Sequence, residues 1–285
     1  MAESFVPSVR LRRIARVLRD WREPTGLSSG EVAAKAGWSA TKQSRLENAK
    51  IPITPVDVLT LALTYDIPEA ERTQAFNAVQ AAQAPQWWDE VTQGGLLDDI
   101  RDYVELEAES TTARIFKIDL IAGLMQTTDY ATALVRGYDP SVSEQVLQSR
   151  VDARVKRQAR LRGDDPIRLE AIVAEGALHI QVGGREVMRE QLRHLIDLTA
   201  LPNVDLRVLP AAGGAHPAMG VSFALLSFAD GEPDVGHIEL QERSVYLEEA
   251  SDVVPYRRTF DSLRELVLDP EESVKLIAEV GNLKR

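Results

Sequence analysis

The spacing of apolar residues in the first 84 positions predicts five short helices. Between positions 10 and 23, apolar side chains recur at i, i+3 and i+4, which places them on one helix face: Leu11, Ile14, Ala15 and Leu18. Four further segments are predicted to be helical, namely 28–36, 40–47, 54–65 and 68–84. Proline and glycine at positions 24 and 26 end the first helix, and a proline at 85 marks the end of the fifth. A compact all-α domain is therefore expected over residues 1–84.

After residue 85 the pattern becomes a mixture of strand-like and helix-like segments. Strands are predicted at 112–120, 167–173, 204–209, 221–228 and 235–240. Helices are predicted at 141–162, 184–200, 250–267 and 270–280. Because strands and helices interleave late in the chain, we expect one sheet with helices packed against it. The predicted fold class is α+β, with a mixed α+β domain over residues 85–285.

The most informative stretch is LSSGEVAAKAGWSATKQSRLENA, at residues 27–49. Ser28 and Glu31 have the spacing of a capping box at a helix N-terminus. Gly37 follows that helix, where a positive φ is needed, and Ser39 is placed to cap the next one. Two short helices joined by a glycine-containing turn form a helix-turn-helix unit.

The string G-W-S-x-x-K-x-S-R-L-E at residues 37–47 resembles the lambda-repressor-like (Xre) family, in the form found in actinobacterial regulators. In that family the second helix enters the major groove of DNA with its N-terminal residues at the base edges. The resemblance implies DNA contacts from Ser29, Ser39, Ala40, Thr41, Lys42, Gln43, Arg45 and Lys50. The alternative is that the helix pair is a corner of an all-α domain used only for protein contacts.

The resemblance also implies a role for individual positions. Ala40, Thr41 and Arg45 fall on base-contacting positions, and Lys42 falls beside the phosphates. Ser29 stands where the family often has a phosphate-binding glutamine, and Lys50 begins the loop that runs along the DNA backbone. Gln43 departs from the pattern, since that position usually holds an inward-packed Val or Ile. We expect Gln43 either to turn outwards to DNA or to weaken the small core.

The charge distribution agrees with a DNA-binding N-terminal region. The whole chain has a formal net charge of −11, which by itself argues against a nucleic-acid partner. Residues 10–50, however, contain 10 Lys and Arg against 4 Asp and Glu. Phosphate contacts act within a screening length of about 8–10 Å at ordinary salt. A distant acidic domain therefore weakens non-specific binding and steering more than it blocks a specific contact.

Most of residues 87–280 resembles the C-terminal domain of the same regulators, a domain of unknown function described as antitoxin-like. Short marks carry this resemblance, among them G-L-M-Q-T at 123–127, R-Q-A-R-L at 157–161 and Y-L-E at 246–248. In that family the gene often neighbours one for a small partner protein, so the resemblance implies that this domain docks such a partner. Trp87 and Trp88 point apart on a helix, and we expect one to pack on each domain.

No constellation of catalytic or metal-ligating residues is evident in the sequence. There is no Cys, and the four His residues show no metal-ligand spacing with one another or with carboxylates. An enzyme is therefore not expected, and neither is a metal or another cofactor. A weaker ligand site is placed near Glu175, Arg207 and His216. The basic helix 141–162 could bind nucleic acid, but we expect acids of residues 89–109 to neutralise it.

The sequence thus predicts a sequence-specific DNA-binding transcriptional regulator. One recognition helix makes too few base contacts for genomic selectivity, so we expect a homodimer on an inverted repeat of double-stranded DNA. The alternative is a ligand-responsive regulator with a small-molecule site in the C-terminal domain. A signal peptide and a membrane-spanning segment are both absent from the sequence, so a cytoplasmic location is expected and no membrane partner.

Overall fold

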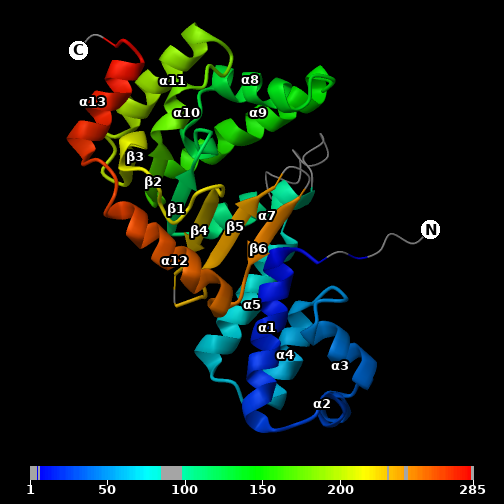
Figure 1. The fold of residues 1–285 in the computed structure, drawn as a ribbon. Helices are drawn as coiled ribbons and strands as arrows, with labels where there is room; N and C mark the ends of the chain where they lie inside the picture. Colours follow the sequence, from blue (N-terminus) through cyan, green and yellow to red (C-terminus); the bar gives the residue numbers. More distant parts are fainter. Residues whose placement is uncertain (1–4, 6, 85–97, 230, 241–242, 284–285) are drawn as a thin grey trace. The chain divides into compact units, whose positions relative to one another are not determined.

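The computed structural model describes residues 5, 7–84, 98–229, 231–240 and 243–283. The chain divides into two compact units, Met1–Gln86 and Trp87–Arg285 (Figure 1). The first unit is helical and the second combines a sheet with helices, which confirms the predicted α+β class. The expectation for Trp87 and Trp88 lies outside the described residues.

The first unit contains the five predicted helices. They are α1 (Val9–Arg22), α2 (Ser29–Ala36), α3 (Ala40–Glu47), α4 (Pro55–Thr64) and α5 (Glu69–Gln83), with a 3-10 turn η1 (Glu23–Thr25) after α1. Local chemistry fixes their starts, since capping boxes begin α2 at Ser28 and α4 at Thr54. The core that joins the helices includes fully buried apolar side chains, namely Leu18, Val32, Leu46, Val58 and Leu61.

The second unit is built around a six-stranded sheet of order β3-β2-β1-β4-β5-β6. The strands are β1 (Thr112–Lys117), β2 (Arg168–Ala174), β3 (Val204–Leu209), β4 (Phe223–Ser227), β5 (Val235–Glu239) and β6 (Ser244–Leu247). β1, β2 and β3 pair in parallel, whereas β4, β5 and β6 each pair antiparallel with the preceding strand in that order. The carboxyl ends of β1, β2, β3 and β5 therefore lie at the same edge of the sheet.

Seven helices of the second unit are described. They are α7 (Asp98–Glu109), α8 (Thr128–Tyr138), α9 (Glu144–Gln158), α10 (Glu175–His179), α11 (Arg185–Leu198), α12 (Ala250–Arg264) and α13 (Pro270–Val280). α12 packs on β4 and β5 through a cluster that includes Phe116, Phe223 and Phe260, while α13 contacts β3 and α11 (Figure 1). The outer edge of β3 is closed when Ser273 accepts a hydrogen bond from the Val208 amide at 3.1 Å.

Several boundaries differ from the sequence prediction. α7, α8, α10 and β6 lie outside the predicted segments, and the helix expected over 141–162 is α9 followed by a separate 3-10 turn, η3 (Ala159–Leu161). All four residues of β6 are half-buried, so this edge strand shows no alternation in burial. α7 buries two glutamates, Glu105 and Glu107, which obscures its apolar pattern. α8 does bury residues at helical spacing, so its signal was present in the sequence.

A buried ion pair joins α7 to α9. Arg157 donates to both carboxylate oxygens of Glu107, at 2.6 and 2.8 Å, and the Glu107 side chain is 1% exposed. This confirms, for this pair, the expectation that acids of residues 89–109 neutralise the basic helix. Arg157 also lies 5.1 Å from the centre of the Tyr103 ring, so the guanidinium is enclosed by groups that favour its charge.

Removing the arginine from this pair should destabilise the second unit strongly. Arg157→Met leaves the Glu107 carboxylate buried without a counter-charge, and we expect a loss of about 3–5 kcal/mol in the free energy of unfolding. Equilibrium urea unfolding measures this loss. The matched control is Arg136→Met, which breaks the exposed pair with Glu144 and should cost at most about 1 kcal/mol. Similar losses in the two variants would show that the Glu107 pair is not effectively desolvated.

Candidate nucleic-acid interface

The turn between α2 and α3 is set by residues within the turn itself. Gly37 has φ +74°, a left-handed conformation that a side chain would strain. The next amide, of Trp38, donates to the Ala33 carbonyl at 3.0 Å and closes the end of α2. The Ser39 hydroxyl then accepts from the Lys42 amide at 3.2 Å and begins α3. Two helices with a fixed turn and independent caps result, which is the geometry of a helix-turn-helix unit.

α3 has one buried face and one exposed face. The buried residues are Gln43, Leu46 and Glu47. The exposed residues of α3 and its C-cap are Ala40, Thr41, Ser44, Arg45 and Asn48. Within the described part of the chain, no hydrogen bond or ion pair engages the Arg45 side chain. The three positions assigned to base contacts therefore lie on the exposed face, and the longest of them is unconstrained by the fold.

Lys42 is held at the rim of that face by two neighbours. Its ammonium lies 2.6 Å from Asp57 Oδ1 and 4.3 Å from the centre of the Trp38 ring. Burial acts to raise the pKa of Asp57, but hydrogen bonds from Lys42 and Thr54 outweigh it and hold that pKa below its ordinary value. The Lys42 side chain remains 38% exposed, and an ammonium has three donors. Lys42 can therefore remain paired with Asp57 and still donate a hydrogen bond to a group outside the protein.

Gln43 does not belong to the exposed surface. Its side chain is 0% exposed, and its amide nitrogen donates to Glu47 Oε1 at 2.6 Å and to the Tyr65 hydroxyl at 3.3 Å. Its amide oxygen accepts from Trp38 Nε1 at 3.1 Å. The expectation that Gln43 contacts DNA is therefore wrong for this structure. The residue neither turns outwards nor leaves the core short of partners, because every polar group around it is paired.

The Glu47 carboxylate continues this network to α1. Arg22 Nε donates to Glu47 Oε1 at 2.7 Å, and Arg19 Nη2 donates to the Glu47 carbonyl at 2.8 Å. The hydrogen bond with Glu47 raises the pKa of Arg22. Burial, and then the charge of Glu47, raise the pKa of Tyr65 to about 12, so its hydroxyl stays protonated and available to the network. α1, α3 and the end of α4 are thereby tied together beneath the exposed face.

Sequence reasoning missed this positioning network. The one available signal was the polar Gln43 four residues before Glu47, since i and i+4 residues share a helix face. The network also accounts for two of the basic residues of α1, since Arg19 and Arg22 both donate hydrogen bonds to Glu47 inside the domain.

The remaining predicted contacts lie around the two helices. Ser29 is half-buried at the first position of α2, and Ser39 is exposed at the start of α3. Lys50 is exposed in the loop after α3, where its amide donates to the Arg45 carbonyl at 2.8 Å. The seven candidates other than Gln43 thus lie on α2, on α3 and its cap, and in the following loop, and each is exposed or half-buried.

The residues of the second predicted site, Glu175, Arg207 and His216, each contact a different neighbour. Glu175 accepts from the Ala211 amide at 2.8 Å, and Arg207 pairs with Asp205 on its own strand. The His216 ring packs edge-on against Phe116, with 5.7 Å between ring centres. Across the described residues, no hydrogen bond or ion pair links any two of Glu175, Arg207 and His216. A ligand site at these residues stays a prediction.

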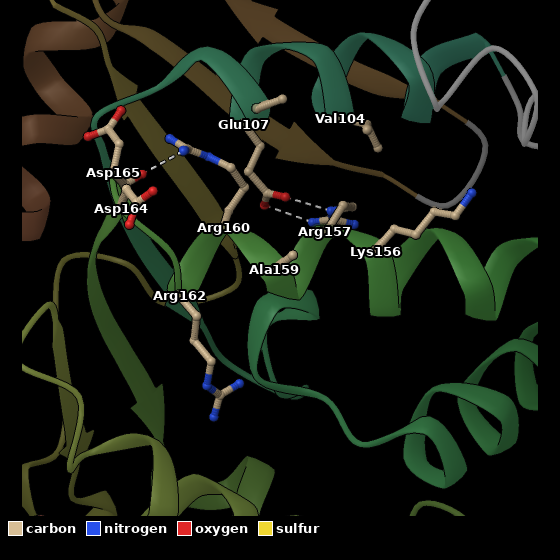
Figure 2. A pocket seen from close by; sticks show the side chains of 10 residues that line it. Val104, Glu107, Lys156, Arg157, Ala159, Arg160, Arg162, Asp164 and Asp165 are labelled. Atoms are coloured by element: carbon tan, nitrogen blue, oxygen red, sulfur yellow. Dashed lines mark hydrogen bonds and ion pairs between the residues drawn. The ribbon is translucent and has the colours of Figure 1, made fainter.

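A pocket of about 330 Å³ lies elsewhere, between α7 and the end of α9 (Figure 2). Its charged lining residues are Glu107, Lys156, Arg157, Arg160, Arg162, Asp164 and Asp165. Figure 2 shows that Glu107 and Arg157 face each other, while Arg160 donates to the Asp165 carbonyl. The two best-enclosed charges are thus already paired.

Over the parts of the chain that the structure describes, no three His, Asp or Glu side chains gather as a metal site requires. None of the described helices has the length and apolar composition to cross a bilayer.

Comparison with known families places both regions. A family model described as a helix-turn-helix domain matches residues 13–75, which contain α2 and α3 entirely. A second, described as a domain of unknown function (DUF5753), matches residues 100–279. No curated protein and no solved structure matches the chain. The helix-turn-helix match, together with the exposed face of α3, indicates a DNA-binding regulator.

Replacing Gln43 by an apolar residue should destabilise the first unit. Gln43→Leu removes the partner of Trp38 Nε1 and one partner each of Glu47 and Tyr65, and we expect a loss of about 1–3 kcal/mol. Urea unfolding followed by tryptophan fluorescence measures it. Ser44→Ala, the adjacent exposed position, serves as the control and should change stability by less than about 0.5 kcal/mol. A more stable Gln43→Leu variant would mean that an apolar core suits this position better.

Proposed function

We propose that this chain, which belongs to the DUF5753 family and carries a helix-turn-helix domain, is a transcriptional regulator that reads a specific DNA sequence through α3. The observation that carries the proposal is the division of α3. On its buried face, Gln43 and Glu47 are hydrogen-bonded to neighbouring side chains of the domain. On its exposed face, the Arg45 side chain makes no hydrogen bond or ion pair with the described residues. An exposed arginine side chain on a helix that the core fixes in place is suited to hydrogen-bond with base edges in the major groove.

The exposed residues divide into two roles in this proposal. Arg45 reads a guanine through its O6 and N7 atoms, the commonest specific contact of arginine, and Ala40 and Thr41 approach neighbouring base edges. Ser29, Ser39, Lys42 and Lys50 hold the phosphates and set the position of the helix in the groove. The excess of Lys and Arg over residues 10–50 supports this division, because phosphate contacts depend on local charge.

In this proposal residues 1–84 recognise DNA and residues 85–285 control it. Two copies of the chain bind an inverted repeat, since one α3 contacts too few bases for selectivity in a genome. The second region dimerises or docks a small protein encoded beside it, as in the antitoxin-like actinobacterial Xre regulators that the sequence resembles. Its acidic composition, 35 Asp and Glu against 22 Lys and Arg over residues 83–285, favours a partner with a basic surface.

A ligand-responsive regulator remains the second candidate. Glu175, Arg207 and His216 make no direct hydrogen bond or ion pair with one another among the described residues, so a site at these residues stays a prediction. Two arginines of α9, Arg150 and Arg154, do favour it, because neither forms an ion pair with the described residues.

The test is recovery of bound fragments from a sheared genome with the full-length purified chain, followed by sequencing. A recurrent inverted repeat supports the proposal, and its half-site spacing gives the separation of the two α3 helices. Repeating the experiment with the neighbouring small protein shows whether that partner changes occupancy. No enrichment at low salt, with a folded protein, would rule out sequence-specific recognition by this chain alone.

Substitutions at Arg45 and Lys42 should differ in kind. Arg45→Ala should weaken binding to the preferred site by about 1–3 kcal/mol and relax preference at one base pair. Lys42→Ala should weaken binding to all sequences alike and reduce the slope of log K against log salt by about 1. Fluorescence anisotropy over a salt series, on the preferred duplex and on single-base variants of it, measures both.

A control on folding accompanies the Lys42 variant, because Lys42→Ala also removes the partner of Asp57. Its urea unfolding curve is recorded so that lost stability is not mistaken for lost binding. An equal loss on every duplex for Arg45→Ala would show that Arg45 contacts phosphate instead of a base.

A further inference from the structure

α9 carries three arginines at successive turns, and only Arg157 forms an ion pair with a carboxylate of the described residues. The charges of Asp139 and Glu239 act on Arg150 and Arg154 without an ion pair. Arg157 is paired with Glu107 through Nε and Nη2. Arg154 donates a single hydrogen bond, from Nη1 to the Arg150 carbonyl at 3.3 Å, and no carboxylate of the described residues lies within ion-pair distance of it. Arg150 Nε is buried and has no hydrogen-bond partner among those residues. Two neighbouring guanidinium groups are therefore left with free donors.

This arrangement is costly for the fold. Like charges at i and i+4 repel each other on a helix, and Arg157 adds a third positive group on the same side. Burial, then the charges of Arg157 and Arg150, lower the pKa of Arg154 to about 10, against the opposing charge of Glu239. Glu239 itself is tied to Lys117 at 3.2 Å. A buried donor without a partner, such as Arg150 Nε, is rare in native proteins and calls for an explanation, of which a bound ion is one.

The surroundings of Arg154 have the chemistry of a ligand site. Lys117 and Glu239 are the last residues of β1 and β5, at the edge of the sheet where four strands have their carboxyl ends. Open sheets of this kind bind ligands outside the carboxyl ends of their strands. Tyr138, at the end of α8, is 67% exposed, and its phenol is influenced by the charges of both Glu239 and Arg154. α8 packs on α9, as Figure 1 shows.

We propose that Arg150 and Arg154 form a binding site for the oxyanion of a small ligand, a carboxylate or a phosphate, with the Tyr138 ring as its exposed wall. Guanidinium groups present forked donors that match both anions, and two of them one turn apart supply more donors than a single group needs. This inference rests on the proposed function in one respect only. If the chain is a DNA-binding regulator, occupancy of this site is the signal that the second region senses.

Thermal unfolding of the full-length chain tests the site without knowledge of the natural ligand. The probes are sodium phosphate and sodium acetate, each compared with sodium chloride at equal ionic strength. We expect one oxyanion to raise the Tm of the wild-type chain by a few degrees above chloride, as binding to the native state alone requires. The larger of the two shifts identifies phosphate or carboxylate as the recognised group.

Arg154→Gln supplies the decisive comparison. We expect it to abolish the oxyanion shift and, in chloride, to leave the Tm equal to or above that of the wild type, because it removes an uncompensated charge. Arg136→Gln, an exposed arginine on α8 paired with Glu144, is the matched control and should keep the full shift. A purely structural Arg154, paired within the chain, predicts the opposite: a lower Tm in chloride and an unchanged response to oxyanions.

The outcomes separate this inference from the proposed function. A wild-type chain that shows no shift above chloride with either oxyanion overturns the site, even if its DNA binding is intact. A chain that binds no specific DNA but shows an oxyanion shift lost in Arg154→Gln retains the site and loses the regulator proposal. If both hold, the oxyanion with the larger shift should change the affinity for the preferred duplex in the wild type and leave it unchanged in Arg154→Gln.

Discussion

The buried carboxylate of Glu47 is the group on which the orientation of α3 and its exposed face depends. It accepts from Arg22 of α1 and from Gln43 of its own helix, and Gln43 in turn contacts Tyr65 at the end of α4. A charge taken out of water is tolerated only when such partners surround it. The rotation of α3 is consequently fixed by directional hydrogen bonds as well as by apolar packing. That precision decides which residues of α3 face outwards.

The second unit also contains a buried ion pair between a glutamate and an arginine, but two further arginines on the same helix form no such pair. Glu107 and Arg157 form a closed pair between α7 and α9, just as Glu47 and Arg22 do between α3 and α1. Arg150 and Arg154, on the same helix as Arg157, have no such partner among the described residues. Arg157 forms an ion pair and helps to hold the fold together, whereas Arg150 and Arg154 form none and reduce its stability. Costly groups of the second kind are the ones that function commonly explains.

The two units also divide the work by charge. Positive residues concentrate over positions 10–50, whereas the remainder of the chain is acidic. Within the first unit, some positive residues are structural, as Arg19 and Arg22 show, and others such as Arg45 and Lys50 remain on the surface. Counting charges therefore locates the DNA-binding region but does not identify the contacts. Identifying them requires knowing which cations the fold has already used.

The sequence by itself determined the features that depend on residues three or four apart. The two capping boxes, the glycine at 37 and the bounds of α3, β3 and α13 follow from local spacing. Only the tertiary structure decided which polar side chains form hydrogen bonds or ion pairs inside the fold. Gln43 was expected on the DNA side and is buried, because its partner Tyr65 lies 22 positions away, and the partner of Arg157 lies 50 positions away. Such pairings arise when helices pack, and no linear pattern of apolar and polar residues records them.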